Sequence, residues 1–181
     1  MTISSALTQF HIQNNLPQNG GENDNFFYLR FKLFSLKFPN PSFRKKVLHI
    51  HDIEHILYDC DTSWKGESFI AGWEIATGMW KVFPIGLFSL NAMGFGLFLF
   101  PKEVYKGYKT GLQCNGILNL DMEKEKLLNL EVAELKKRIQ KKKKVEMTWF
   151  RKSVYLLWMI VSSISFLFPA ILIVAILLFI L

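Results

Sequence analysis

The chain has 181 residues, of which 50% are hydrophobic and 15% aromatic, and its formal net charge is +7. This length suits one domain with an accessory segment. The two cysteines, Cys60 and Cys114, form no CxxC pair, so they imply neither a disulfide framework nor a thiolate zinc site. The positive charge shows no interleaved RNA-binding aromatic signature or helix-turn-helix pattern, and we expect no nucleic-acid partner.

The N-terminal part of the chain has weak structural signals. Residues 1–25 are rich in Asn, Gln, Ser and Gly without an apolar signal-peptide core, and we expect a disordered N-terminal tail. Residues 26–38 alternate apolar and basic positions and then change phase. This pattern predicts a bulged edge strand or an extended lead-in to the helices. A membrane-surface segment is the functional alternative.

A first helix is predicted over about residues 43–58. Pro39 and Pro41 cannot lie inside a helix or a central strand, and Ser42 suits the helix N-cap. Apolar residues then recur at spacings of three and four and form a core stripe, namely Phe43, Val47, Ile50, Ile53 and Leu57. A second helix, capped by Thr62 or Ser63, is predicted to continue to about residue 78.

Four side chains in these two helices form a candidate metal site. At about 100° per residue, His51, Asp52 and His55 share one arc of the first helix. Glu67 lies in the first turn of the second helix, where the positive helix end favours a carboxylate. Two nitrogens and two carboxylate oxygens could surround one divalent ion. The alternative is that these are ordinary polar pairs on a solvated helix face.

Other histidine-dependent sites fit this sequence poorly. The chain has only four histidines, at positions 11, 49, 51 and 55, too few for the several histidine boxes of a desaturase-type di-iron oxygenase. The HExxH motif of zinc proteases places Glu directly after the first His, where this chain has Asp52. An HD-type phosphohydrolase needs a separate upstream histidine and a distant downstream aspartate, and His49, only two residues before His51, cannot be that histidine.

The C-terminal part combines a basic segment with an apolar one. Residues 121–144 read as a charged amphipathic helix, with acidic residues early and lysines late. Residues 141–152 form a basic juxtamembrane segment that suits anionic lipid. Residues 153–181 contain no charge and predict a transmembrane anchor with a kink at Pro169. The basic side places the domain in the cytoplasm, so we expect a single-pass, tail-anchored membrane protein.

The pattern HDxxH, followed by eleven residues and Glu67, resembles the signature of the Coq-four proteins of ubiquinone (coenzyme Q) biosynthesis. The likeness covers about residues 26–140, including the segments 38–41 and 72–74. It implies that His51, Asp52, His55 and Glu67 are metal ligands, with zinc the expected ion and iron the alternative. It also implies an all-α fold, a small helical domain that here carries a C-terminal transmembrane helix.

The uncharged residues 82–100 allow two interpretations. They could span a thin bilayer, although Pro84 and several glycines interrupt them. The resemblance favours the second interpretation, a buried helix pair, because the family is helical and works on polyprenylated substrates. In that case the apolar surface could form a groove for an isoprenoid tail.

Two functions follow from the resemblance. The first is a metal-dependent lyase (decarboxylase) that removes the C1 carboxylate of a polyprenylated benzoate with oxidation there, in the synthesis of ubiquinone or a related prenylquinone. The second is a non-catalytic, lipid-binding scaffold that organises a quinone or other prenyl-lipid biosynthetic complex. The expected partners are membrane lipid, a prenylated lipid substrate, other quinone-biosynthesis enzymes and a possible second copy of the chain.

Overall fold

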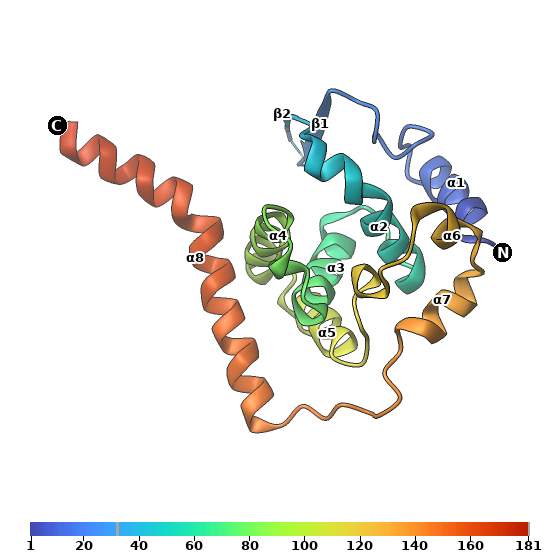
Figure 1. The fold of residues 1–181 in the computed structure, drawn as a ribbon. Helices are drawn as coiled ribbons and strands as arrows, with labels where there is room; N and C mark the ends of the chain where they lie inside the picture. Colours follow the sequence, from blue (N-terminus) through green and yellow to red (C-terminus); the bar gives the residue numbers. More distant parts are fainter. Residues whose placement is uncertain (32, 181) are drawn as a thin grey trace. The chain divides into compact units, whose positions relative to one another are not determined.

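The computed structural model describes residues 1–31 and 33–180, which form eight α-helices, two short 3-10 helices and one antiparallel strand pair (Figure 1). The all-α prediction is confirmed. The chain divides into two compact units. The first unit is Met1–Asp59 with Asp121–Arg138, and the second is Cys60–Leu120 with Ile139–Leu181.

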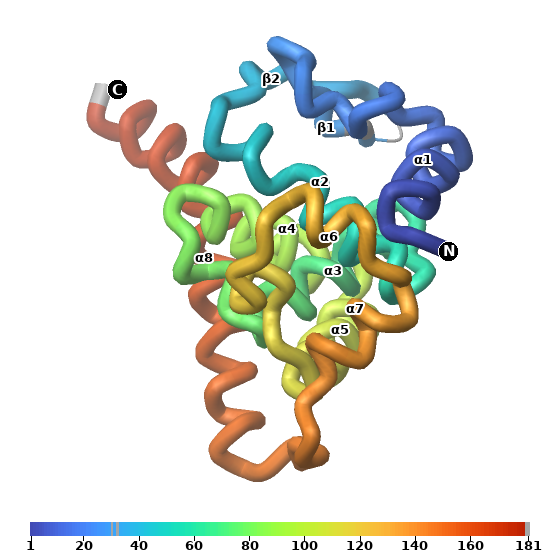
Figure 2. The backbone as a smooth tube through the Cα atoms, turned by 45° about the vertical axis from the view of Figure 1, so that its right-hand side comes forward, coloured from blue at the N-terminus to red at the C-terminus, as the bar shows by residue number. Residues whose placement is uncertain are grey.

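The first unit begins with helix α1 (Ile3–Gln13), where the sequence predicted a disordered tail over residues 1–25. That prediction is wrong, because apolar residues at helical spacing are buried on one face of α1, namely Ile3, Ala6, Leu7 and Phe10. The N-terminus is also fixed by the backbone: Ile3 N donates to Leu130 O at 2.8 Å, and Val132 N donates to Met1 O at 3.1 Å. Figure 2 shows these chain segments side by side.

A two-stranded hairpin follows, formed by β1 (Phe26–Arg30) and β2 (Ser35–Pro39). The predicted extended conformation of this segment is therefore confirmed, with the two halves paired to each other. Phe27 lies opposite Phe38, and their rings stack with centroids 5.6 Å apart. The Arg44 guanidinium lies 4.3 Å from the Phe27 ring centroid and links the hairpin to the start of α2.

Helix α2 (Ser42–Tyr58) has nearly the predicted bounds, but the prediction of Ser42 as its N-cap is wrong, because Ser42 is the first helical residue and Pro41 is the N-cap. The unit also contains α6 (Lys124–Asn129) and most of α7 (Val132–Ile139). The C-terminal end of α7 lies at the boundary of the unit, after Arg138. The sequence predicted one helix over residues 121–144, and this prediction is wrong. The break falls at Leu130 and Glu131 because Glu131 forms a β-bridge with Thr2 and Leu130 accepts a backbone hydrogen bond from Ile3.

The second unit is built on α3 (Trp64–Thr77) and α5 (Pro101–Gly111), with the 3-10 helices η1 (Met79–Lys81) and η2 (Ile117–Leu120). The backbones of α3 and α5 lie very close together, because a Cβ atom at Gly72 would clash with Val104 O and one at Gly107 with Phe69 O. The core between α3, α4 (Ile85–Leu99) and α5 contains Ala71, Ile75, Met93, Val104 and Tyr108.

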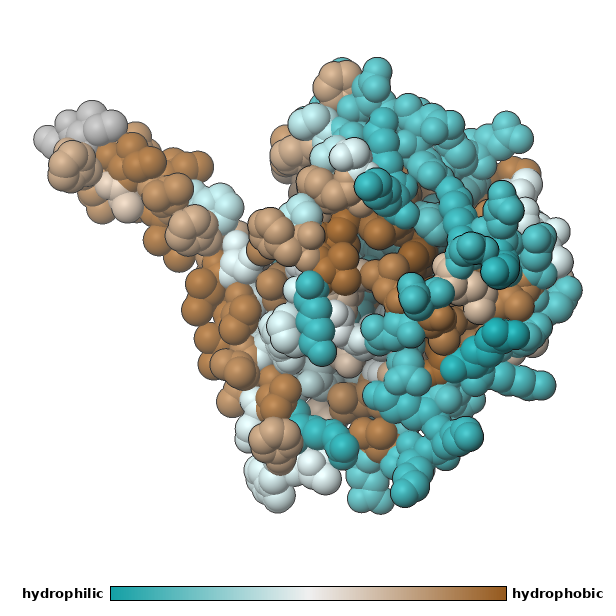
Figure 3. Space-filling model, viewed as in Figure 1, coloured by the Kyte–Doolittle hydropathy of each residue, from teal (hydrophilic) through white to brown (hydrophobic). Residues whose placement is uncertain are grey.

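Helix α8 (Trp149–Ile180) is long and apolar enough to cross a membrane, and little of it is buried (Figure 3). Pro169 lies inside it, and Leu181, the last residue of the predicted anchor, lies outside the described residues. The predicted C-terminal apolar helix is confirmed. Helix α4 covers most of the stretch 82–100 as one helix of 15 residues, shorter than a membrane span.

Candidate metal centre

The two motif histidines lie on successive turns of α2. Residues four apart share a helix face, so the rings of His51 and His55 meet. Their Nε2 atoms are 3.3 Å apart, and their ring planes are inclined at 73°. His51 is half-buried, whereas His55 is 1% exposed. The ring of Phe10 from α1 lies against His55, with centroids 5.7 Å apart, and helps to bury it.

The spacing of the His51 and His55 nitrogens suits shared coordination. Two nitrogens bound to one tetrahedral ion at 2.0–2.1 Å are about 3.3 Å apart. The His51 and His55 Nε2 atoms have this separation. The same distance also fits one N–H···N hydrogen bond between neutral rings. The separation of the two nitrogens is therefore compatible with shared binding of one metal ion as well as with a hydrogen bond between the rings.

Asp52, the third motif residue on α2, is bound by a histidine from α1. His11 Nε2 lies 2.9 Å from Asp52 Oδ2, and both side chains are 7% exposed. His11 Nδ1 lies 3.0 Å from the carbonyl oxygen of Gln18. Gly20, with φ +65°, gives the pair room, because a Cβ atom there would lie 2.5 Å from Asp52 Oδ2.

The hydrogen bonds of His11 indicate its charge. Both ring nitrogens face oxygens that accept hydrogen bonds, the Asp52 carboxylate and the Gln18 carbonyl. A neutral imidazole has only one N–H group, whereas the imidazolium has two and satisfies both acceptors. The hydrogen bond to Asp52 raises the pKa of His11, and burial opposes this shift. Both the hydrogen-bond geometry and the raised pKa favour the charged form of His11 in this buried pair with Asp52.

The fourth motif residue, Glu67, lies in the first turn of α3. The cap of this helix is Ser63, one of the two residues that the sequence predicted, and its hydroxyl accepts a hydrogen bond from Gly66 N at 3.4 Å. Asp61 in turn accepts hydrogen bonds from Ser63 N and Oγ at 3.1 and 2.5 Å. The half-buried Glu67 carboxylate therefore stands at an ordered, positively polarised helix end.

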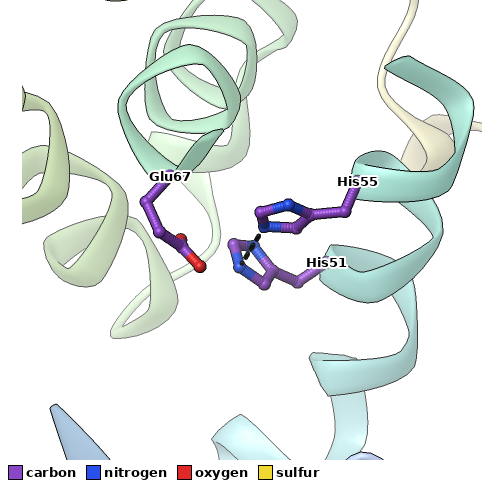
Figure 4. Close-up of side chains that lie close together, drawn as sticks. All are labelled: His51, His55 and Glu67. Carbon is purple, nitrogen blue, oxygen red and sulfur yellow. Dashed lines mark hydrogen bonds between the residues drawn. The ribbon is translucent and has the colours of Figure 1, made fainter. Parts of the chain in front are cut away.

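The described residues contain two groups of side chains that could hold a metal ion. The first is His51, His55 and Glu67, drawn in Figure 4, and the second is His51, Glu54 and Glu74. The histidines and Glu54 belong to α2 in the first unit, and the other two carboxylates belong to α3 in the second unit. That the two histidines and a carboxylate of α3 bind one ion together is a proposal.

The sequence prediction and the structure differ most at Asp52 and His11. Asp52 is in neither group, and its direct ligation of a metal stays a prediction. His11 was missed, because it lies in the segment predicted to be disordered. The apolar spacing of Ile3, Leu7 and Phe10 is the signal that could have revealed its helix.

Comparisons with protein-family models, with curated proteins and with solved structures find no match to this chain. The resemblance to the Coq-four proteins therefore rests on the sequence motif and stays a prediction.

Proposed function

We propose that this protein binds one divalent metal ion, zinc or alternatively iron, through His51, His55 and Glu67. The observation that carries the proposal is the 3.3 Å separation of the two Nε2 atoms on α2. The order of the elements supports Glu67 as the third ligand. His55 is in the last turn of α2, Glu67 is in the first turn of α3, and only residues 59–63 connect the two helices.

Asp52 is the fourth residue of the proposed set. Because His11 binds its Oδ2 atom, Oδ1 is the oxygen that direct ligation would use. His11 fixes the orientation of the carboxylate, as hydrogen-bonding partners do around metal ligands.

We further propose that α8 anchors the protein in a membrane with the rest of the chain in the cytoplasm. The support is the charge pattern: Arg151, Lys152 and the lysines of residues 141–144 precede the apolar stretch, and basic residues favour the cytoplasmic side. Trp149 is exposed at the start of α8, as expected for an aromatic residue at the membrane interface.

The resemblance of the HDxxH motif and Glu67 to the Coq-four signature supports a role in the synthesis of ubiquinone or a related prenylquinone, and the proposed site and anchor are compatible with this role. The proposed substrate is a polyprenylated benzoate, and the reaction is loss of its C1 carboxylate with oxidation there, the electrons passing to an external oxidant. A bound ion would act as a Lewis acid on a ring oxygen or carboxylate. Helix α8 would keep the site close to a substrate that stays in the bilayer.

A non-catalytic scaffold is the second candidate, and the exposed apolar side chains of α4 favour it. Phe88, Phe98 and Leu99 offer a lipid-binding surface that requires no chemistry. In this role the metal would be structural and fully coordinated by protein. The protein would then bind prenylated lipids and organise other quinone-biosynthesis enzymes, alone or as a homo-oligomer.

The test is a lipid extract from cells that lack the gene, complemented with the wild-type chain, His55→Ala or the matched control His49→Ala. We expect the prenylquinone pool to fall and a precursor that retains its carboxylate to accumulate. His49→Ala should restore the pool, and His55→Ala should not. A general loss of prenylated intermediates would favour the scaffold, and an unchanged extract would contradict both functions.

A further inference from the structure

Helix α4 lies directly against the first half of α8. The rings of Phe98 on α4 and Phe166 have centroids 5.9 Å apart, and the ring of Trp80, in η1 just before α4, has its centroid 5.0 Å from that of Trp158. Between these contacts a Cβ atom at Gly94 would clash with the carbonyl oxygen of Ser162. Since only a glycine allows this approach, the contact between α4 and α8 is a close helix–helix packing.

The part of α8 that α4 and Trp80 contact, residues 158–166, lies in the stretch of α8 that has no charged residue. Lys152 is the last charged residue before this stretch, and crossing the hydrocarbon core takes about 20 residues. A span that starts after Lys152 therefore includes residues 158–166. The outer side of the same turns is apolar and exposed, with Leu156, Leu157, Ile160 and Ile164. If α8 crosses the membrane there, α4 lies beside it at the depth of lipid.

The outward side chains of α4 suit the same surroundings. The stretch 82–100 has no charged residue, and its large exposed side chains are Phe83, Leu87, Phe88, Phe98 and Leu99, with exposed fractions from 42% to 81%. In water these residues would form an apolar patch of the kind that marks an interaction site. The helix has 15 residues and is about 22 Å long, too short to cross the bilayer.

A lysine lies at each end of α4. Lys81 precedes the helix and Lys102 follows it, and long lysine side chains can extend to the headgroups while their stems lie along apolar surface. Helix α4 itself has no charged residue, so these two flanking lysines are the charges at its ends that would have to reach the headgroups. Anionic headgroups would complement both charges.

We propose that the second unit enters the bilayer through α4 as well as α8, with α4 lying against α8 in the bilayer and its exposed apolar side chains covered by acyl chains. This inference rests on the proposed span of α8. We infer that lipid covers the exposed face of α4, because this face adjoins α8, whose outer side is also apolar. The membrane contact is then a two-helix surface and not a single anchor.

The test uses the full chain in liposomes of phosphatidylcholine with some phosphatidylglycerol, in a Cys60→Ser, Cys114→Ser background. Single cysteines for spin labels are introduced by Leu87→Cys and Leu99→Cys on α4, Ile164→Cys on α8 and Lys109→Cys on α5. All four positions are exposed, so a label fits at each. Collision rates with oxygen, which enters lipid, and with a water-soluble nickel chelate are compared at each position.

We expect oxygen to collide more often than nickel at both α4 positions and at Ile164→Cys, and the reverse at Lys109→Cys. If the label at Ile164→Cys is in lipid but the labels on α4 collide mainly with the nickel chelate, this inference is wrong, whereas the proposal that α8 is a membrane anchor still holds. Nickel access at Ile164→Cys as well would overturn the anchor too. Shielding of α4 from both reagents would indicate a protein partner and would also overturn the inference. Circular dichroism of each variant confirms the fold.

Discussion

His11 on α1 and Asp52 on α2 form a buried hydrogen bond of 2.9 Å across 41 positions of sequence. The contact connects the N-terminal helix to the helix that carries the motif histidines. Phe10, the neighbour of His11, packs on the His55 ring, so α1 contacts the candidate centre at two adjacent residues. The N-terminal segment is thus part of the candidate site.

Replacing His11 should destabilise the first unit. His11→Ala leaves the Asp52 carboxylate buried without its partner, and breaking such a pair costs about 3 kcal/mol. Urea unfolding of the metal-free protein measures the change. Gln9→Ala, at an exposed position of α1, is the control and should change the free energy of unfolding by less than about 0.5 kcal/mol. Equal effects of the two substitutions would show that the buried pair contributes nothing.

The contribution of His11 should depend on pH in a defined direction. Its pKa is raised above the ordinary value of 6.5, chiefly by the hydrogen bond to Asp52. A raised folded-state pKa means that the charged histidine stabilises the fold below pH 6.5 and that this contribution disappears as pH rises through the folded pKa. The difference in unfolding free energy between wild type and His11→Gln should therefore be larger at pH 6 than at pH 8. A difference that grows with pH would contradict the imidazolium assignment.

Gly20 should tolerate no larger residue. Its φ of +65° is unfavourable for other residues, and an added Cβ atom would lie 2.5 Å from Asp52 Oδ2 and 3.0 Å from His11 Nε2. Gly20→Ala should therefore cost at least about 1–3 kcal/mol, the range for backbone strain alone. Gly116→Ala is the control, because its backbone lies outside the left-handed region and its nearest contact would be 3.3 Å. A thermal scan with no loss for Gly20→Ala would show that this turn adjusts freely.

Local signals were sufficient to predict the helices that carry the motif. Pro41 and the apolar stripe of residues 43–57 defined α2 almost to the residue, and the Ser63 cap defined the start of α3. The absence of charge after Lys152 predicted the apolar part of α8, although the helix itself begins earlier, at Trp149. In each case the determinants lie within a few residues of the element, so a sequence pattern alone is informative.

The sequence predictions that were wrong concern elements whose structure depends on long-range contacts. Helix α1 was not predicted because the segment is mostly polar in composition. Its few apolar residues at helical spacing stabilise the helix only when they pack on α2. The break between α6 and α7 follows from the bridge between Thr2 and Glu131, which no local pattern indicates. The same holds for His11: its relation to Asp52 depends on the packing of α1 and could not be predicted from spacing.

Elemental analysis of the purified full-length protein tests the central claim most directly. We expect close to one zinc or iron ion per chain, lost in His51→Ala, His55→Ala and Glu67→Ala and retained in His49→Ala, whose side chain lies outside the motif. Wild-type protein without metal, or full metal content in His55→Ala, would contradict the proposed centre.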